Sequence, residues 1–443
     1  MKKIIAIALI LIFTAAACSC SATGGEQYSY DSLYSSLSEA IDNGADTAEV
    51  SFRGSLDSER STVEEDLHRI MNCYDIGSRI SGMEISYREG LGSYTITMKF
   101  NPSDREKPEM TVRDYTKYLL EDVLYDAVMK REEHVSAVFT QADGVDSEKV
   151  NSDIINIQSE NEYIAYLTSQ FRSSIYTFSD AVEVYIDIDY REGTSSDIIE
   201  IGGMSDLEII NCLIDRFSSW DEKVVLHSGS GIDMDYITGL VTQAYANDCR
   251  DIVCEPTGVK AEKYSGEAGY ITEVYLDMAA SGEQCEEKAE KMRAEIDKAA
   301  AELRESTDGM TRREKLEAIT EYVCGKTEYD QDIADTPVED MSESMFFDRT
   351  VYGVLVSGRT VCTGYAYTVK VLCDELDIPC WVVFGKLYDG SDHAWNAVEI
   401  DGEVKYIDAT FIDEGHDGYF LFDRAYYTKD NRANFEGWII PFE

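Results

Sequence analysis

The chain has 443 residues, with 86 acidic side chains against 39 basic ones and a formal net charge of −47. This charge argues against a nucleic-acid partner, because the phosphates would be repelled. Apolar residues make up 44% of the sequence and aromatic residues 11%, which is enough to build hydrophobic cores and excludes a wholly disordered chain. A chain of this length is expected to form about two to four domains.

The first residues have the pattern of a targeting segment. Two lysines and the apolar stretch 4–13 lead into three alanines and Cys18, and the stretch is too short to cross a bilayer as a helix. Ala-Ala-Ala-Cys resembles a bacterial lipoprotein box, although Ala15 stands where that pattern usually has Leu. We therefore expect residues 1–17 to be removed, Cys18 to be lipidated, and the protein to be anchored to a membrane outside the cytoplasm. A lipid on Cys20 and plain secretion are the alternatives.

The 11 cysteines show no paired C-x-x-C spacing, so neither a metal site nor a cofactor is expected. Cys249 with Cys254, and Cys373 with Cys380, are compatible with disulfides in an oxidising compartment and equally with buried reduced side chains. The acidic stretch 330–340 lacks the twelve-residue ligand pattern of a calcium loop.

The region before the C-terminal third is predicted to consist of an N-terminal linker and helix (18–46) and three small α+β modules (47–130, 131–220 and 221–308). Each module follows a strand–helix–strand–strand–helix (βαββα) pattern, repeated at roughly 86 residues. Since no reactive cluster occurs there, a spacing or binding role is expected. The first strands are expected at 49–52, 134–140 and 223–227, the helices after them near Ser61, Ser159 and Asp233, the strand pairs at 83–88 with 93–100, 182–190 with 198–201 and 259–264 with 270–278, and the closing helices from Thr111, Ser205 and Gly282.

The C-terminal domain is predicted to span 309–443. Residues 306–309 break a long helical pattern, and Thr311 with Glu314 forms the capping box of the next helix. Farther along, Cys362 falls at the start of another helical pattern, where peptide dipoles and free N–H groups are expected to lower the pKa of a thiol and to stabilise an oxyanion. Gly364 permits close backbone approach at that helix start.

Two strands, 393–400 and 403–409, flank an Asp401-Gly402 turn, which is a strong two-residue hairpin signal. A hairpin centred on this dipeptide makes His393 and Asp408 diagonal neighbours on one face. The hairpin would therefore supply a base that is already held by an orienting carboxylate. Only a nucleophile would be needed to complete the site.

Three segments resemble the motifs of the bacterial transglutaminase-like superfamily, whose fold is papain-like. The resemblance covers about residues 309–425, and the reactive residues are spaced by 31 and 15 positions. The segments are Val361-Cys-Thr-Gly-Tyr-Ala366, His393-Ala-Trp-Asn-Ala-Val398 and Tyr406-Ile-Asp-Ala-Thr-Phe411.

The resemblance implies a nucleophile at Cys362, a base at His393 and an orienting acid at Asp408. It implies an enzyme that acts on peptide or glutamine amide bonds through a thioester, as a protease, an amidase or a transglutaminase-like acyltransferase. The substrate would be a protein or peptide, and the lipid anchor would give the enzyme access to those of the cell envelope. The alternative is a cell-surface binding lipoprotein whose transglutaminase-like domain is vestigial.

The supporting residues are assigned from the same resemblance. Tyr329 is the expected second oxyanion donor, and Trp395 and Asn396 are expected to shape or shield the strand that carries the histidine. Thr363 departs from the family pattern, which commonly has Gln there.

Overall fold

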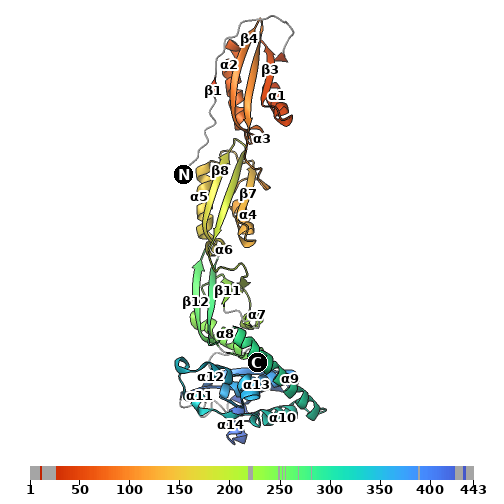
Figure 1. Ribbon diagram of the computed structural model, residues 1–443, viewed down its shortest axis with the longest axis vertical. Helices are drawn as coiled ribbons and strands as arrows, with labels where there is room; N and C mark the ends of the chain where they lie inside the picture. The colour runs from red at the N-terminus through yellow and green to blue at the C-terminus, as the bar shows by residue number, and fades with distance from the viewer. Residues whose placement is uncertain are drawn as a thin grey trace. The chain divides into compact units, whose positions relative to one another are not determined.

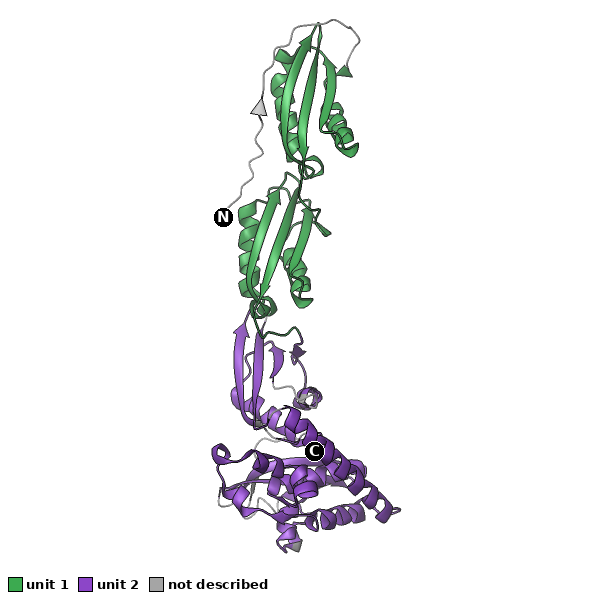
Figure 2. Ribbon diagram, viewed as in Figure 1, with its two compact units in different colours: residues 1–196 green, residues 197–443 purple. Residues whose placement is uncertain are grey.

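The computed structural model describes residues 10–11, 26–217, 223–247, 250–251, 253–254, 256–267, 269–280, 282–387, 390–424 and 433–435. The predicted lipidation site, Cys18, lies outside the described residues. The chain divides into two compact units, residues 1–196 and 197–443 (Figure 2). The architecture is a mixture of helices and sheets, in agreement with the predicted α+β class (Figure 1).

The first unit contains two mixed sheets, with strand orders β1-β4-β5-β3-β2 and β6-β7-β9-β8. The central strands of each sheet are antiparallel. Its strands are β1 (Ile10–Leu11), β2 (Glu26–Gln27), β3 (Thr47–Arg53), β4 (Ile80–Gly90), β5 (Ser93–Pro102), β6 (Met110–Arg113), β7 (His134–Thr140), β8 (Thr168–Thr177) and β9 (Ala181–Tyr190). Its helices are α1 (Tyr30–Asp42), α2 (Leu56–Asn72), α3 (Tyr74–Gly77), α4 (Lys117–Met129), α5 (Ser147–Glu160) and α6 (Glu162–Leu167).

The two sheets of this unit repeat one local packing arrangement. In the first, the Tyr28 ring meets the Phe52 ring edge-on at 5.0 Å, and its hydroxyl donates to Asp66 at 2.7 Å. In the second, the corresponding distances are 5.2 Å and 2.8 Å. The second set of residues, each 87 positions after the first, is Tyr115, Phe139 and Asp153.

The predicted order of elements is out of phase with the observed one. α4 packs on β7 and α5, so the helix that was assigned to the end of one module contacts the strand that follows it. The order is therefore helix, strand, helix, strand, strand. The helix expected near Ser159 begins at Ser147 instead.

The strand pair predicted at 182–190 and 198–201 is wrong. β9 pairs with β8, whereas β10 (Ile199–Glu200) pairs with a strand of the next sheet. β8 escaped prediction because it is an edge strand whose side chains are mostly exposed and polar, so it lacks apolar alternation.

The second unit begins with a third sheet, β10-β11-β13-β12, covered by two helices and followed by the C-terminal sheet β18-β17-β16-β19. The third sheet has the same strand order as the second. The elements are α7 (Asp206–Phe217), β11 (Lys223–Ser228), α8 (Met234–Asn247), β12 (Pro256–Ser265), β13 (Tyr270–Met278), α9 (Gly282–Ser306), α10 (Arg312–Cys324), β14 (Glu328–Tyr329), α11 (Gln331–Asp335), η1 (Val338–Asp340), α12 (Glu343–Asp348), η2 (Gly353–Ser357), β15 (Arg359–Thr360), α13 (Cys362–Glu375), β16 (Cys380–Leu387), β17 (Asp392–Ile400), β18 (Glu403–Ile407), α14 (Ala409–Asp413), η3 (Asp417–Tyr419) and β19 (Ala433–Phe435).

Both faces of the C-terminal sheet are buried, each in a different core. Val382 and Ala394 pack in one core with side chains of α9, α10 and α13. Val383 and Trp395 pack in the other core with α8 and β13 of the third sheet. The boundary predicted at residue 309 therefore falls between elements that share cores, although the capping box of Thr311 and Glu314 does start α10 as expected.

The cysteines of α13 and β16 are reduced. Cys373 and Cys380 are both buried, and their thiols share a hydrogen bond. Cys254 is also buried, while its predicted partner Cys249 lies outside the described residues. Among the described residues, no helix is long and apolar enough to cross a membrane.

A pair of glycine substitutions tests the packing of α13 against the preceding strand. A Cβ on Gly364 would lie 1.9 Å from Thr360 Oγ1 and 3.0 Å from Thr350 O, whereas Gly239 in α8 faces open space. We expect Gly364→Ala to lower the free energy of unfolding by about 1–3 kcal/mol. Gly239→Ala should raise it by about 0.5–1 kcal/mol, because Ala favours the helix. Urea unfolding followed by tryptophan fluorescence measures both, and equal effects would contradict the close approach.

Candidate active site

Cys362 is the first residue of α13, as predicted, and is half-buried. Hydroxyl groups on either side of it fix the start of the helix. Thr360 Oγ1 donates to Asp348 O at 2.6 Å, and Thr363 Oγ1 donates to Arg349 O at 2.7 Å. Thr363, which departs from the family pattern, thus anchors the helix start to the preceding segment. The first amides of α13 have no partners within the helix and can face an oxyanion.

The hairpin register predicted from the Asp-Gly turn is confirmed. Asn396 pairs with Ile407 across β17 and β18. β18 ends there, and Asp408 follows as the N-cap of α14, where its Oδ1 accepts from Phe411 N at 3.3 Å. The cap holds the carboxylate in place, and its other oxygen, Oδ2, lies 2.7 Å from His393 Nε2.

The ionisation of His393 is set by its surroundings. It is 6% exposed and Asp408 is fully buried. Burial alone would lower the pKa of His393, but the charge and hydrogen bond of Asp408, with a further hydrogen bond to Cys362, raise it to about 10. Since Nε2 faces Asp408, Nδ1 is the nitrogen that faces the thiol. The three predicted residues therefore meet, and the histidine is held as an imidazolium that can pair with a thiolate.

Tyr329 is brought to the same site by a short strand pair. β14 runs parallel to β15, and Tyr329 lies opposite Thr360, two residues before Cys362. Burial, followed by electrostatic interaction with Cys362, raises the pKa of Tyr329 to about 12. Its hydroxyl therefore keeps its proton at neutral pH, which is what an oxyanion donor requires.

Trp395 and Asn396 lie on opposite faces of β17. The indole of Trp395 is buried and stacks on His393, with the ring centroids 6.0 Å apart. Asn396 points away from that ring, and its Nδ2 donates to Ala366 O in α13 at 2.8 Å. Asn396 therefore ties the strand of the base to the helix of the nucleophile instead of facing the thiol.

Phe411 contacts the base but was given no role from the sequence. Its ring centroid lies 5.0 Å from that of His393, so aromatic rings contact the imidazole from both Trp395 and Phe411. The signal that could have identified it is its place three residues after Asp408, in the first turn of α14. Among the described residues, no group of three or more His, Cys, Asp or Glu side chains could hold a metal ion.

A comparison with protein-family models agrees with the motif resemblance in this region. Residues 297–409 match the family model of the transglutaminase-like superfamily, and the match contains all three residues of the site. Kyphoscoliosis peptidase of Mus musculus is 25% identical over 150 residues, which cover 29% of this chain and 22% of the mouse protein. Its Homo sapiens counterpart is 24% identical over 211 residues, which cover 42% of this chain and 30% of the human protein. This chain thus spans less than a third of these relatives. A crystal structure of a TGase is 19% identical and covers 56% of this chain and 67% of that chain, with a TM-score of 0.26.

The raised pKa of His393 makes a prediction about stability. A histidine with an unfolded pKa of about 6.5 and a folded pKa of about 10 stabilises the fold fully below the first value and loses this contribution as the pH rises towards the second. We expect a loss of a few kcal/mol, as an order of magnitude, between about pH 6.5 and 10.

Urea unfolding across this pH range, compared between the wild type and Asp408→Asn, isolates the effect from other titrating groups. The variant lacks the charge that raises the pKa of His393, so its stability should depend less on pH in this range. Identical pH slopes for the two proteins would contradict the assignment.

Proposed function

We propose that this protein is a thiol enzyme that acts on amide bonds of peptides or of glutamine side chains. The observation that supports this most directly is the buried pair of His393 and Asp408, in contact with a half-buried cysteine at a helix start. A structural cysteine would need neither a charged base nor helix amides beside it.

The proposed reaction has two halves. The proton of Cys362 passes to His393, which gives the imidazolium–thiolate pair, and the thiolate attacks the carbonyl carbon of the amide. The amides at the start of α13 and the hydroxyl of Tyr329 stabilise the oxyanion, and the imidazolium gives its proton to the leaving amine. The resulting thioester is then released either by water, which yields an acid, or by a second amine, which yields a crosslink.

Among these outcomes we favour peptide hydrolysis. The mouse and human relatives are named as peptidases, and this name supports hydrolysis. This chain matches less than a third of each of those proteins. The substrate class that we propose is a protein or peptide of the cell envelope.

This location rests on the sequence pattern before Cys18. We propose that the protein is extracytoplasmic and is anchored to a membrane by lipid on Cys18, with secretion as the alternative. Cys18→Ser should abolish the incorporation of a labelled fatty acid and move the protein from the membrane fraction to the soluble fraction. Incorporation that survives in Cys18→Ser but is lost in Cys20→Ser would reassign the lipid to Cys20.

A second candidate function is binding, favoured by three sheets outside residues 297–409 in which four strands follow the same order, with one additional strand in the first sheet. We propose that these sheets are duplicated modules that grip a partner. If binding were the whole function, substitution of Cys362 would leave partner binding and the cellular phenotype unchanged.

One experiment separates these functions. Wild type and Cys362→Ala are incubated with cell-surface peptides and a labelled primary amine, and mass spectrometry distinguishes cleavage, deamidation and crosslinking. A thiol probe is added in parallel. We expect Cys362→Ala to abolish turnover. It should also abolish labelling by the thiol probe of the tryptic peptide that contains position 362.

Cys324 offers a matched control. Burial, with the nearby charge of Asp413, raises the pKa of its thiol to about 12, so it should be unreactive. Cys324→Ala should therefore keep wild-type labelling and turnover. Wild-type turnover by Cys362→Ala would refute the proposed enzyme.

A further inference from the structure

The end of α8 contacts the sheet that carries the catalytic base. Asn247, the last residue of this helix, accepts a hydrogen bond from Val382 N in β16 at 2.9 Å. In the described part of the chain, β19 pairs with this edge of β16 at residues 385–387, and Asn247 provides the partner for an edge N–H farther along the strand. Asn247 is itself buried, and its Nδ2 donates to Gln243 O at 2.9 Å, which fixes its orientation.

The contact continues across the sheet to the helix of the nucleophile. Val382 lies opposite Asn396 in the β16–β17 pair. Asn396 in turn donates to Ala366 O in α13. A line of contacts therefore runs from α8 through a cross-strand pair of residues to α13, three residues along β17 from His393.

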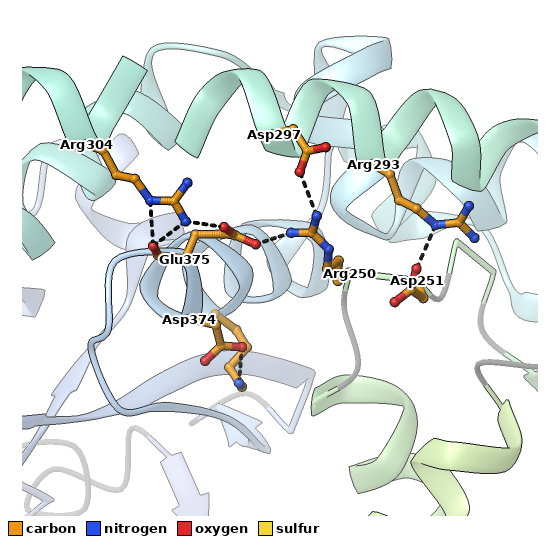
Figure 3. A network of polar contacts seen from close by, with 8 residues as sticks. Arg250, Asp251, Arg293, Asp297, Arg304, Asp374 and Glu375 are labelled. Carbon is orange, nitrogen blue, oxygen red and sulfur yellow. Dashed lines mark hydrogen bonds and ion pairs between the residues drawn. The ribbon is translucent and has the colours of Figure 1, made fainter. Parts of the chain in front are cut away.

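Three residues after Asn247, Arg250 contacts the other end of α13 (Figure 3). Its guanidinium binds the carboxylate of Glu375, the last residue of that helix, and also donates to Asp297 in α9 at 2.6 Å. Arg304 of α9 binds the same carboxylate at 2.5 Å and donates to the Glu375 backbone oxygen at 2.8 Å and 3.1 Å. The C-terminal end of the helix that begins at Cys362 is thus held by two arginines.

Apolar contacts also link the end of α8 to the strand that carries the base and to the helix that carries the nucleophile. α8 side chains share a core with Trp395, which stacks on His393. Ala246, Val253 and Cys254, on either side of Arg250, share the other core with α13. α8 and the residues Arg250, Val253 and Cys254 precede the segment 297–409 that matches the transglutaminase-like family model.

We propose that the end of α8, through Asn247 and Arg250, is a positioning element that sets the separation of Cys362 from His393. Asn247 holds the sheet that carries the base, and Arg250 holds the helix that carries the nucleophile. A rigid helix held at its far end cannot shift its first residue along or across the sheet without breaking the contacts of Glu375. The inference rests on the proposed function, because it assigns a role in the same reaction.

The test is the rate at which iodoacetamide alkylates Cys362 in the full chain, read at the peptide level by mass spectrometry at about pH 6 and about pH 9. An imidazolium beside a cysteine favours its reactive form at the lower pH, so the ratio of the two rates reports the contact of His393 with Cys362. We expect Arg250→Ala and Asn247→Ala to lower the rate at the lower pH by about 10- to 100-fold, because small misplacements of reacting groups have effects of this size.

Arg293→Ala is the matched control. Arg293 of α9 binds Asp251, next to Arg250, at 2.6 Å and Glu286 of its own helix at 3.3 Å, so its polar contacts in the described structure lie away from α13 (Figure 3). Arg293→Ala should leave the ratio of the two rates at its wild-type value. Arg250→Lys should bring the ratio closer to the wild-type value than Arg250→Ala does. Simple loss of folding would instead raise alkylation at both pH values and would also expose Cys373.

The outcomes separate the two claims. If the wild-type Cys362 reacts rapidly and folded Arg250→Ala and Asn247→Ala react equally fast, the positioning role is refuted while the proposed enzyme stands. If wild-type Cys362 reacts no faster than Cys324, the proposed enzyme and the positioning role both fall.

Discussion

The buried pair of His393 and Asp408 is the interaction on which the second unit depends. A fully buried carboxylate is tolerated only when it is paired and hydrogen-bonded, and Asp408 meets both conditions through His393 and the Phe411 amide. The pair therefore requires the hairpin, the cap of α14 and the aromatic rings that exclude water to form together. Its chemistry and its folding are consequently difficult to separate.

The sequence was sufficient to predict the local geometry of this pair. Asp401 and Gly402 both have positive φ, at 55° and 81°, which is the backbone that an Asp-Gly hairpin turn requires. This turn fixes the register, and the register fixes which side chains share a face. The start of α13 was predictable for a similar reason, because apolar residues at helical spacing begin just after Cys362.

The features of the fold and the site that could not be predicted depend on contacts between segments far apart in the chain. β8 was missed because its polar, exposed side chains resemble a loop. The roles of Asn247 and Arg250 could not be predicted, since Val382 is 135 residues away and Glu375 is 125 residues away. Asn396 was expected to shape or shield the strand of the histidine, but that its amide binds the backbone of α13 follows only from the folded arrangement of β17 and α13.

The three sheets of similar order differ in how their cores are closed. The first sheet buries its apolar side chains among its own elements, between Leu33 and Phe100. The third shares its helix α8 with the C-terminal sheet, so part of its core belongs to both. Gain or loss of the first sheet would therefore leave the cores of the second unit unchanged, whereas the third sheet cannot be exchanged without changing one of them. We expect related chains to vary in the number of sheets at the N-terminal end while keeping the sheet that directly precedes the thiol domain.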